Sequence, residues 1–146
     1  RLFLKAIDRY ANDEECLPLL AFEAEPDIKK AVIASMQASI NYATQAGSVP
    51  QGCFMSSCVA ASVETVEGAK EMLKQSIDDT DNRLARRFDA EVSRGKLPDD
   101  FPALERARLM FDLRQGMVLR ARAGISKQSL SSEIKQRAAM IFVLNK

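Results

Sequence analysis

The chain has 146 residues, 47% of them hydrophobic and 28% charged, values that fit one globular domain with its own core. Its 21 lysines and arginines nearly balance 20 aspartates and glutamates, which excludes a basic surface that binds nucleic acid by neutralising phosphates. No apolar run approaches the roughly 20 residues of a membrane span, and no signal peptide opens the chain. We therefore expect a cytoplasmic protein without a membrane partner.

The first ten residues already show helical periodicity. One face of the expected helix collects Leu2, Phe3, Ala6, Ile7 and Tyr10. Domains seldom begin in the middle of a helix, and neither a methionine nor a capping residue opens this one. We therefore expect an N-terminal piece to precede Arg1.

Two prolines interrupt the next stretch. Pro18 and Pro26 lie within CLPLLAFEAEPD, which we interpret as a connector with at most one short helical turn. From Asp27 to Ala46 apolar residues recur every three or four positions, which predicts a helix that stops at Gly47.

The middle of the chain combines a loop with the longest expected helix. GSVPQG is the loop, and CFMSSCVAASVET after it carries almost no charge, so we expect a short, mostly buried helix there. Thr65 can cap a long helix through Arg94, which Gly95 would end. Asp99 or Asp100 would cap the following helix, with Pro102 tolerated in its first turn.

The stretch from Pro102 to Leu144 predicts two helices, over about 103–123 and 127–143, with Gly124 ending the first and Ser126 capping the second. At ~100° per residue, apolar side chains fill roughly 200° of the first helix, against ~100° for an ordinary surface helix. They are Leu109, Leu113, Met117, Met110, Ala121, Ala107, Val118, Phe111 and Leu104. We expect the rest of the chain to cover one side of this arc and a second copy to cover the other.

The fold class that follows is all-α, an antiparallel helical bundle of about six helices that forms a homodimer through its last two. The second of these helices has a narrower apolar seam at helical spacing. The predicted dimer interface comprises Leu109, Leu113, Met117, Leu130, Ile134, Ala138, Ile141 and Phe142.

Arg114 lies inside the apolar arc, near Phe111 and Val118. An unpaired charge there would be expensive. In one interpretation Arg114 lines a pocket and pairs with an anionic group on a ligand. In the other it pairs with an acidic side chain at the dimer seam or extends to solvent, as long arginines commonly do.

Methionines and aromatic residues recur on the expected helix faces. Thioethers and aromatic rings suit a pocket of adaptable shape, although plain core packing explains each residue as well. The candidate ligand-binding residues are Met36, Tyr42, Phe54, Met55, Met72, Met110, Phe111 and Arg114. We expect the ligand to be small and largely apolar.

The sequence lacks the residues that most often form catalytic and metal-binding sites. The chain has no histidine, so the commonest general base and the Ser–His and Cys–His pairs are missing. Cys53 and Cys58 lie five positions apart, roughly 140° around a helix, so they point to different faces. We expect no metal, no cofactor and no enzymatic activity.

Four motifs together resemble the C-terminal regulatory domain of the tetracycline-repressor (TetR) family of transcriptional regulators. LFLKAIDRY resembles the helix after the family's DNA-binding head, and PQGCFMSS the entry to its sixth helix. EVSRGKLPDDF resembles the junction before the eighth helix, and LRQGMVLRARAGISKQSL the pattern across the last two helices. Their order and spacing extend over nearly the whole chain.

The resemblance implies a helix-turn-helix head before this segment, which would bind operator DNA as a dimer. It further implies that the last two helices form an intersubunit four-helix bundle. The helices between would then enclose an effector pocket, whose occupation changes the spacing of the two heads.

Two alternatives stay open at this point. A free-standing helical protein-interaction module would use the broad apolar arc to receive a different protein and would have no enclosed cavity. A helical enzyme that uses carboxylates is a weaker third possibility, for which no motif speaks.

Overall fold

The computed structural model describes residues 2, 5, 16–45 and 60–145. Within these residues the protein consists of seven helices and no strand, which confirms the predicted all-α class for that part of the chain. The helices are α2 (Leu17–Ala24), α3 (Ile28–Ala43), α4 (Ala60–Ser62), α5 (Ala69–Ser93), α6 (Ala103–Arg122), α7 (Lys127–Ser132) and α8 (Ile134–Ile141). None of them is long and apolar enough to cross a membrane.

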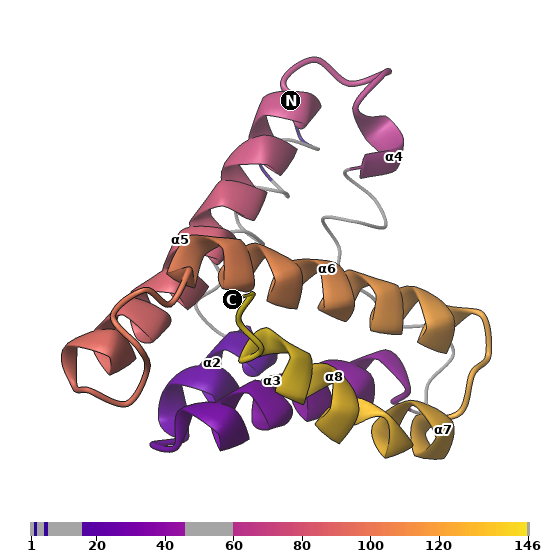
Figure 1. Ribbon diagram of the computed structural model, residues 1–146. Coiled ribbons are helices and arrows are strands. Elements are labelled where there is room, and N and C mark those ends of the chain that lie inside the picture. Colours follow the sequence, from indigo (N-terminus) through magenta and orange to yellow (C-terminus); the bar gives the residue numbers. More distant parts are fainter. Residues whose placement is uncertain (1, 3–4, 6–15, 46–59, 146) are drawn as a thin grey trace.

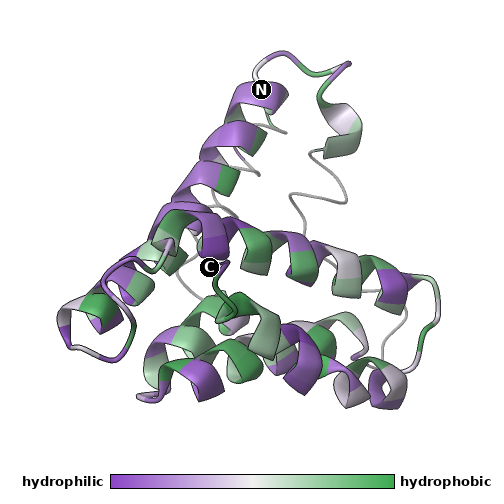
Figure 2. Ribbon diagram, viewed as in Figure 1, coloured by the Kyte–Doolittle hydropathy of each residue, from purple (hydrophilic) through white to green (hydrophobic). Residues whose placement is uncertain are grey.

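Helix α3 lies at the centre of the arrangement. It contacts α2, α6, α7 and α8, while α5 packs on α6 and α4 on α5. In Figure 1 the pair α2 and α3 lies below α6, and α8 runs in front between them. Figure 2 shows hydrophobic residues gathered where these helices face each other, whereas the first half of α5 is mainly hydrophilic.

The stretch expected to be a connector is a complete helix, so that prediction is wrong. In α2, Pro18 occupies the first turn, where a missing N–H breaks no hydrogen bond. The helix ends at Ala24, and Glu25 is extended in front of Pro26, as steric crowding before a proline requires. Proline thus sets the two ends of α2 and does not prevent it from forming.

Helix α3 begins where predicted. The Asp27 side chain caps it, accepting a hydrogen bond from the backbone N–H of Lys30 at 2.9 Å. The helix ends at Ala43, earlier than predicted, and the backbone N–H of Thr44 bonds back to the carbonyl of Ile40 at 2.9 Å. Gly47, the predicted stop, lies outside the described residues.

The start of α5 differs from the prediction and its end confirms it. The helix begins at Ala69, after Gly68 in the left-handed region at φ 84°, so Thr65 is not the cap. Gly95, at φ 74°, follows the last turn, as expected of a glycine after a helix. The segment predicted as a buried helix lies mostly outside the described residues, and its described end, α4, has no buried residue.

Of the signals predicted for the last helices, the glycine stop and the serine cap are confirmed and the aspartate cap is not. No side chain caps α6, so the predicted cap at Asp99 or Asp100 is wrong. Gly124 follows α6 at φ 94°, and the Ser126 hydroxyl caps α7 by accepting from the Ser129 N–H at 3.1 Å. The predicted helix over 127–143 is divided at Glu133 into α7 and α8.

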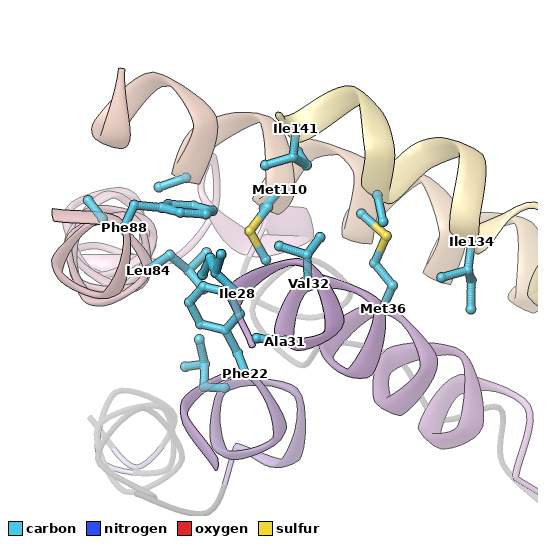
Figure 3. Close-up of a cluster of buried hydrophobic side chains, with 14 of the residues drawn as sticks. Phe22, Ile28, Ala31, Val32, Met36, Leu84, Phe88, Met110, Ile134 and Ile141 are labelled. Carbon is cyan, nitrogen blue, oxygen red and sulfur yellow. The ribbon is translucent and has the colours of Figure 1, made fainter. Parts of the chain in front are cut away.

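The core lies between α2, α3, α5, α6 and α8. Figure 3 shows Met110 of α6 and Val32 of α3 pointing toward one another, with Leu84 and Phe22 nearby. At one end, four rings form what we call the aromatic cluster: Phe22, Phe88, Phe101 and Phe142. The ring centroid of Phe88 lies 5.6 Å from Phe22, 5.2 Å from Phe101 and 6.4 Å from Phe142.

The wide apolar arc of α6 is covered mainly by the chain's own helices. α6 contacts α3, α5, α7 and α8 of the same chain. Of the arc residues, Ala107, Met110, Met117 and Val118 are buried, and only Leu104 is exposed. Leu109, Phe111, Leu113 and Ala121 are half-buried, so the chain's own helices cover part of the arc, and its further covering by a second copy stays a prediction.

Candidate ligand-binding site

A cavity lies between α2, α3, α5 and α6. Its volume open to water is about 10 Å³. It is lined by Leu19, Ser35, Met36, Ser39, Thr80, Leu84, Met110, Phe111 and Arg114. Half of the eight residues predicted to bind a ligand meet here: Met36, Met110, Phe111 and Arg114.

Small hydroxyl residues on α3 and α5 leave this space between the helices. Ser35 and Ser39 follow each other at i and i+4 and are both buried, so one narrow face of α3 points at the cavity. The Ser39 hydroxyl donates to the Ser35 carbonyl at 3.0 Å, and the Thr80 hydroxyl to the Ser76 carbonyl at 2.9 Å. These two hydroxyl protons are used within their own helices, so their oxygens remain available only as acceptors.

Arg114 brings the cation of the cavity wall from the middle of α6. Its side chain is half-buried, and its Nε is buried without a hydrogen-bond partner among the described residues. The nearest polar contact runs from Nη2 to the Cys16 sulfur at 3.9 Å, which is a weak acceptor. Arg114 lines the cavity, as the first of the two interpretations requires, and the pairing at a dimer seam stays a prediction.

The cavity as it stands is closed to a ligand of any size. About 10 Å³ is close to the ~10–15 Å³ needed to hold one water molecule. A larger molecule enters only if the walls move, and the two methionines are the side chains best able to change shape. The cavity wall therefore combines one cation, Arg114, with apolar side chains that include Met36 and Met110.

The other predicted ligand residues do not join this cavity. Tyr42 is exposed near the end of α3, with 36% of its surface accessible. Met72 is half-buried in the first turn of α5 and is absent from the cavity wall. Phe54 and Met55 lie outside the described residues.

The predicted dimer-interface residues fall into two groups. The buried group belongs to the chain's own core: Met117, Leu130, Ile134, Ala138 and Ile141. The half-buried group packs against that core: Leu109, Leu113 and Phe142. A second copy cannot reach the buried group unless the core opens, whereas Leu109, Leu113 and Phe142 stay partly accessible. Dimerisation itself stays a prediction.

A buried ion pair, which the sequence reasoning missed, fastens α5 to the turn between α2 and α3. The Arg87 Nε donates to Glu91 at 3.0 Å, and its two Nη atoms donate to the carbonyls of Phe22 and Glu25, both at 2.6 Å. Arg94 also donates to Glu91 at 2.6 Å. The only signal in the sequence was the i, i+4 spacing of Arg87 and Glu91, a pattern that usually marks a solvated face.

Asp81 is a second buried carboxylate on α5. Burial raises the pKa of its carboxyl, Arg108 at 3.7 Å acts to lower it, and Asp78 and Asp112 act to raise it. The Asp81 Oδ1 has no hydrogen-bond partner in the part of the chain that the structure describes. Asp81 does not line the cavity, and no three histidine, cysteine or acidic side chains among the described residues could together hold a metal ion.

Comparison with family models, with curated proteins and with solved structures gives no match for this chain. The likeness to TetR regulators therefore depends on the four sequence motifs alone.

Proposed function

We propose that this chain is the effector-binding and homodimerisation domain of a TetR-like transcriptional regulator. The observation that carries the proposal is the cavity, because it collects Met36, Met110, Phe111 and Arg114 from different parts of the sequence. The effector is small and largely apolar. Operator DNA is contacted only by an N-terminal helix-turn-helix head in the cytoplasm, outside this sequence, and the domain has no catalytic role.

The position of the cavity supports a mechanism. Its walls come from four helices that pack on each other, so a ligand that enlarges it must move at least one of them. Close-packed interfaces respond to such a change by shifting whole helices. A ligand with higher affinity for the opened arrangement shifts the population toward it, and the shift reaches any head joined to the N-terminal side.

Ligand binding is tested by thermal unfolding of the domain with a panel of small apolar probes. A ligand present at about 100 times its dissociation constant stabilises the fold by roughly 2.7 kcal/mol, which a melting curve resolves easily. Native mass spectrometry of the purified protein then shows whether one molecule binds per chain. If no member of a broad panel raises the midpoint, the proposed pocket is refuted.

The dimer is tested separately by sedimentation at micromolar concentration. Leu119 on α6 is 67% exposed and Met140 on α8 is 58% exposed, so replacing either with lysine disturbs a surface and leaves the core intact. We expect a dimer in the unmodified protein and a weaker one in at least one of the two variants. A stable monomer at all concentrations would contradict homodimerisation. Leu130→Asp and Ile134→Asp are unsuitable, because each would unfold the core.

Two observations favour a free-standing helical interaction module instead. The cavity holds no more than about one water molecule, and large apolar side chains such as Leu17 and Leu119 are exposed. This second candidate predicts no stabilisation by small molecules. The reading frame upstream of Arg1 separates the two candidates, because only the regulator requires a helix-turn-helix there.

A further inference from the structure

We propose that the ligand of this cavity carries one carboxylate, which binds Arg114, and an apolar remainder that lies between Met36, Met110 and Phe111. This inference rests on the proposed function, since it names the chemical class of the effector. It concerns the polar end of the cavity, whereas the proposed function requires only that the cavity takes a small apolar molecule.

Arg114 differs from the other half-buried arginines in its ion pairing. Among the described residues, five arginine side chains are half-buried. Four of them form ion pairs: Arg83 with Glu23, Arg87 with Glu91, Arg106 with Glu105 and Arg137 with Glu133. Arg114 has no such pair within the described part of the chain. Within the described residues every other half-buried guanidinium has a carboxylate partner, and a carboxylate carried by a ligand would complete the same pattern at Arg114.

The position of the unused donor fits this role. The Nε of Arg114 is fully covered and unpartnered, and the side chain lines the cavity. A buried donor without a partner costs free energy that a bound acceptor recovers. A guanidinium offers two parallel N–H groups, which match the two oxygens of a carboxylate.

The remaining wall limits the charge of the ligand. Among the described lining residues Arg114 alone is cationic, and the hydroxyls of Ser39 and Thr80 already donate to their own helices. One cation balances one negative charge, so a monocarboxylate fits better than a dianionic phosphate. The other lining residues include Leu19, Leu84 and the two methionines, which accept an alkyl or aryl chain.

The test compares octanoate with 1-octanol, which have the same chain length and differ in the charge of the head. Both are titrated below micelle-forming concentrations by isothermal calorimetry at pH 7. We expect octanoate to bind about tenfold more tightly than octanol, the ratio that one charge-assisted hydrogen-bonded contact provides. In Arg114→Gln the preference disappears. The matched control is Arg120→Gln, an exposed arginine on the same helix, which keeps the preference.

A second measurement serves if Arg114→Gln fails to fold. In the unmodified protein, the ¹H–¹⁵N resonance of the Arg114 Nε–H should shift on addition of octanoate and stay in place with octanol.

The outcomes separate this inference from the proposed function. Equal affinity for the two probes, or a preference that survives in Arg114→Gln, overturns the carboxylate inference and leaves an apolar pocket standing. Absence of binding by either probe, together with a panel that never stabilises the fold, overturns both. A bound water molecule at Arg114 that octanoate fails to displace also overturns the inference.

Discussion

The two ends of the core are packed with different kinds of side chain. At the aromatic cluster, large rings from α2, α5 and the segments on either side of the last helices interlock around Phe88, and the ion pair of Arg87 and Glu91 closes the end. At the cavity, α3 presents Ser35 and Ser39, and α5 presents Thr80.

The comparison teaches how one core can be tightly packed at one end and adaptable at the other. Large interlocking side chains give a unique packing arrangement, whereas small residues leave space and methionines fill it loosely. An unpartnered arginine adds a polar group that the local packing does not satisfy. The rings of the aromatic cluster therefore hold one packing arrangement, whereas the side chains around the cavity have room to change theirs.

The largest expected effect is at the aromatic cluster. Phe88→Ala should lower the free energy of unfolding by about 3–5 kcal/mol, because Phe88 is fully buried and contacts three other rings. Urea denaturation measures the change. Phe111→Ala, on the half-buried cavity wall, is the matched control and should cost less than half as much. Equal losses would contradict the distinction between the two ends.

The next largest effect is at the ion pair. Arg87→Met should cost about 3 kcal/mol, because it leaves the carboxylate of Glu91, which is 3% exposed, with only Arg94 to balance it. The same denaturation experiment on Lys74→Met provides the comparison. Lys74 pairs with Asp78 at the surface, where such a pair contributes about 0.2–1 kcal/mol. A loss at Arg87 no larger than at Lys74 would show that the pair is dispensable.

At the cavity we expect tolerance. Met36→Leu keeps the volume and the apolar character of the wall and should cost less than about 1.5 kcal/mol. The change should be visible in ligand affinity before it is visible in the unfolding midpoint, because leucine is less able to change shape. A loss of stability as large as that of Phe88→Ala would mean that this end is packed as tightly as the other.

The smallest expected effect depends on pH. Burial raises the pKa of Asp81 above its ordinary value of 3.8, so the folded state binds this proton more tightly than the unfolded state. Stability contributed by the protonated carboxyl is therefore complete below pH 3.8 and is lost as pH rises through the folded-state pKa. Asp81→Asn should therefore have the higher free energy of unfolding at pH 7 in the same urea denaturation experiment.

The pH series supplies the control for this prediction. The difference between Asp81→Asn and the unmodified protein should shrink as the pH is lowered below 3.8, where the aspartate becomes protonated in both the folded and the unfolded state. A difference that stays constant with pH would show that the asparagine acts through packing and not through charge.

Local signals were sufficient for several helix ends. Asp27 and Ser126 cap α3 and α7 as predicted, and Gly95 and Gly124 adopt positive φ after α5 and α6. Each of these signals acts within one turn of the chain, so neighbouring residues decide it. The same kind of signal failed before α5, where Thr65 was the predicted cap and the helix begins only after Gly68.

Part of the candidate site was also predictable. Met36, Met110, Phe111 and Arg114 were identified as pocket residues from residue type and helical position, and they meet in one cavity. Met72 and Tyr42 satisfied the same criteria and do not reach it. Residue type indicates which side chains suit a pocket, but which helix faces meet depends on crossing angles that periodicity does not contain.

By itself the sequence determined that the described residues form helices, where several of them end, and that α6 must be covered over much of its circumference. Only the tertiary structure decided what covers it. The chain's own α3, α5, α7 and α8 pack on α6, and Ile134, Ala138 and Ile141 are buried in the core of the same chain. Periodicity shows only that a face is apolar. Burial against the same chain and burial against a second copy both remove apolar area from water. The pattern therefore cannot distinguish a core face from a dimer interface.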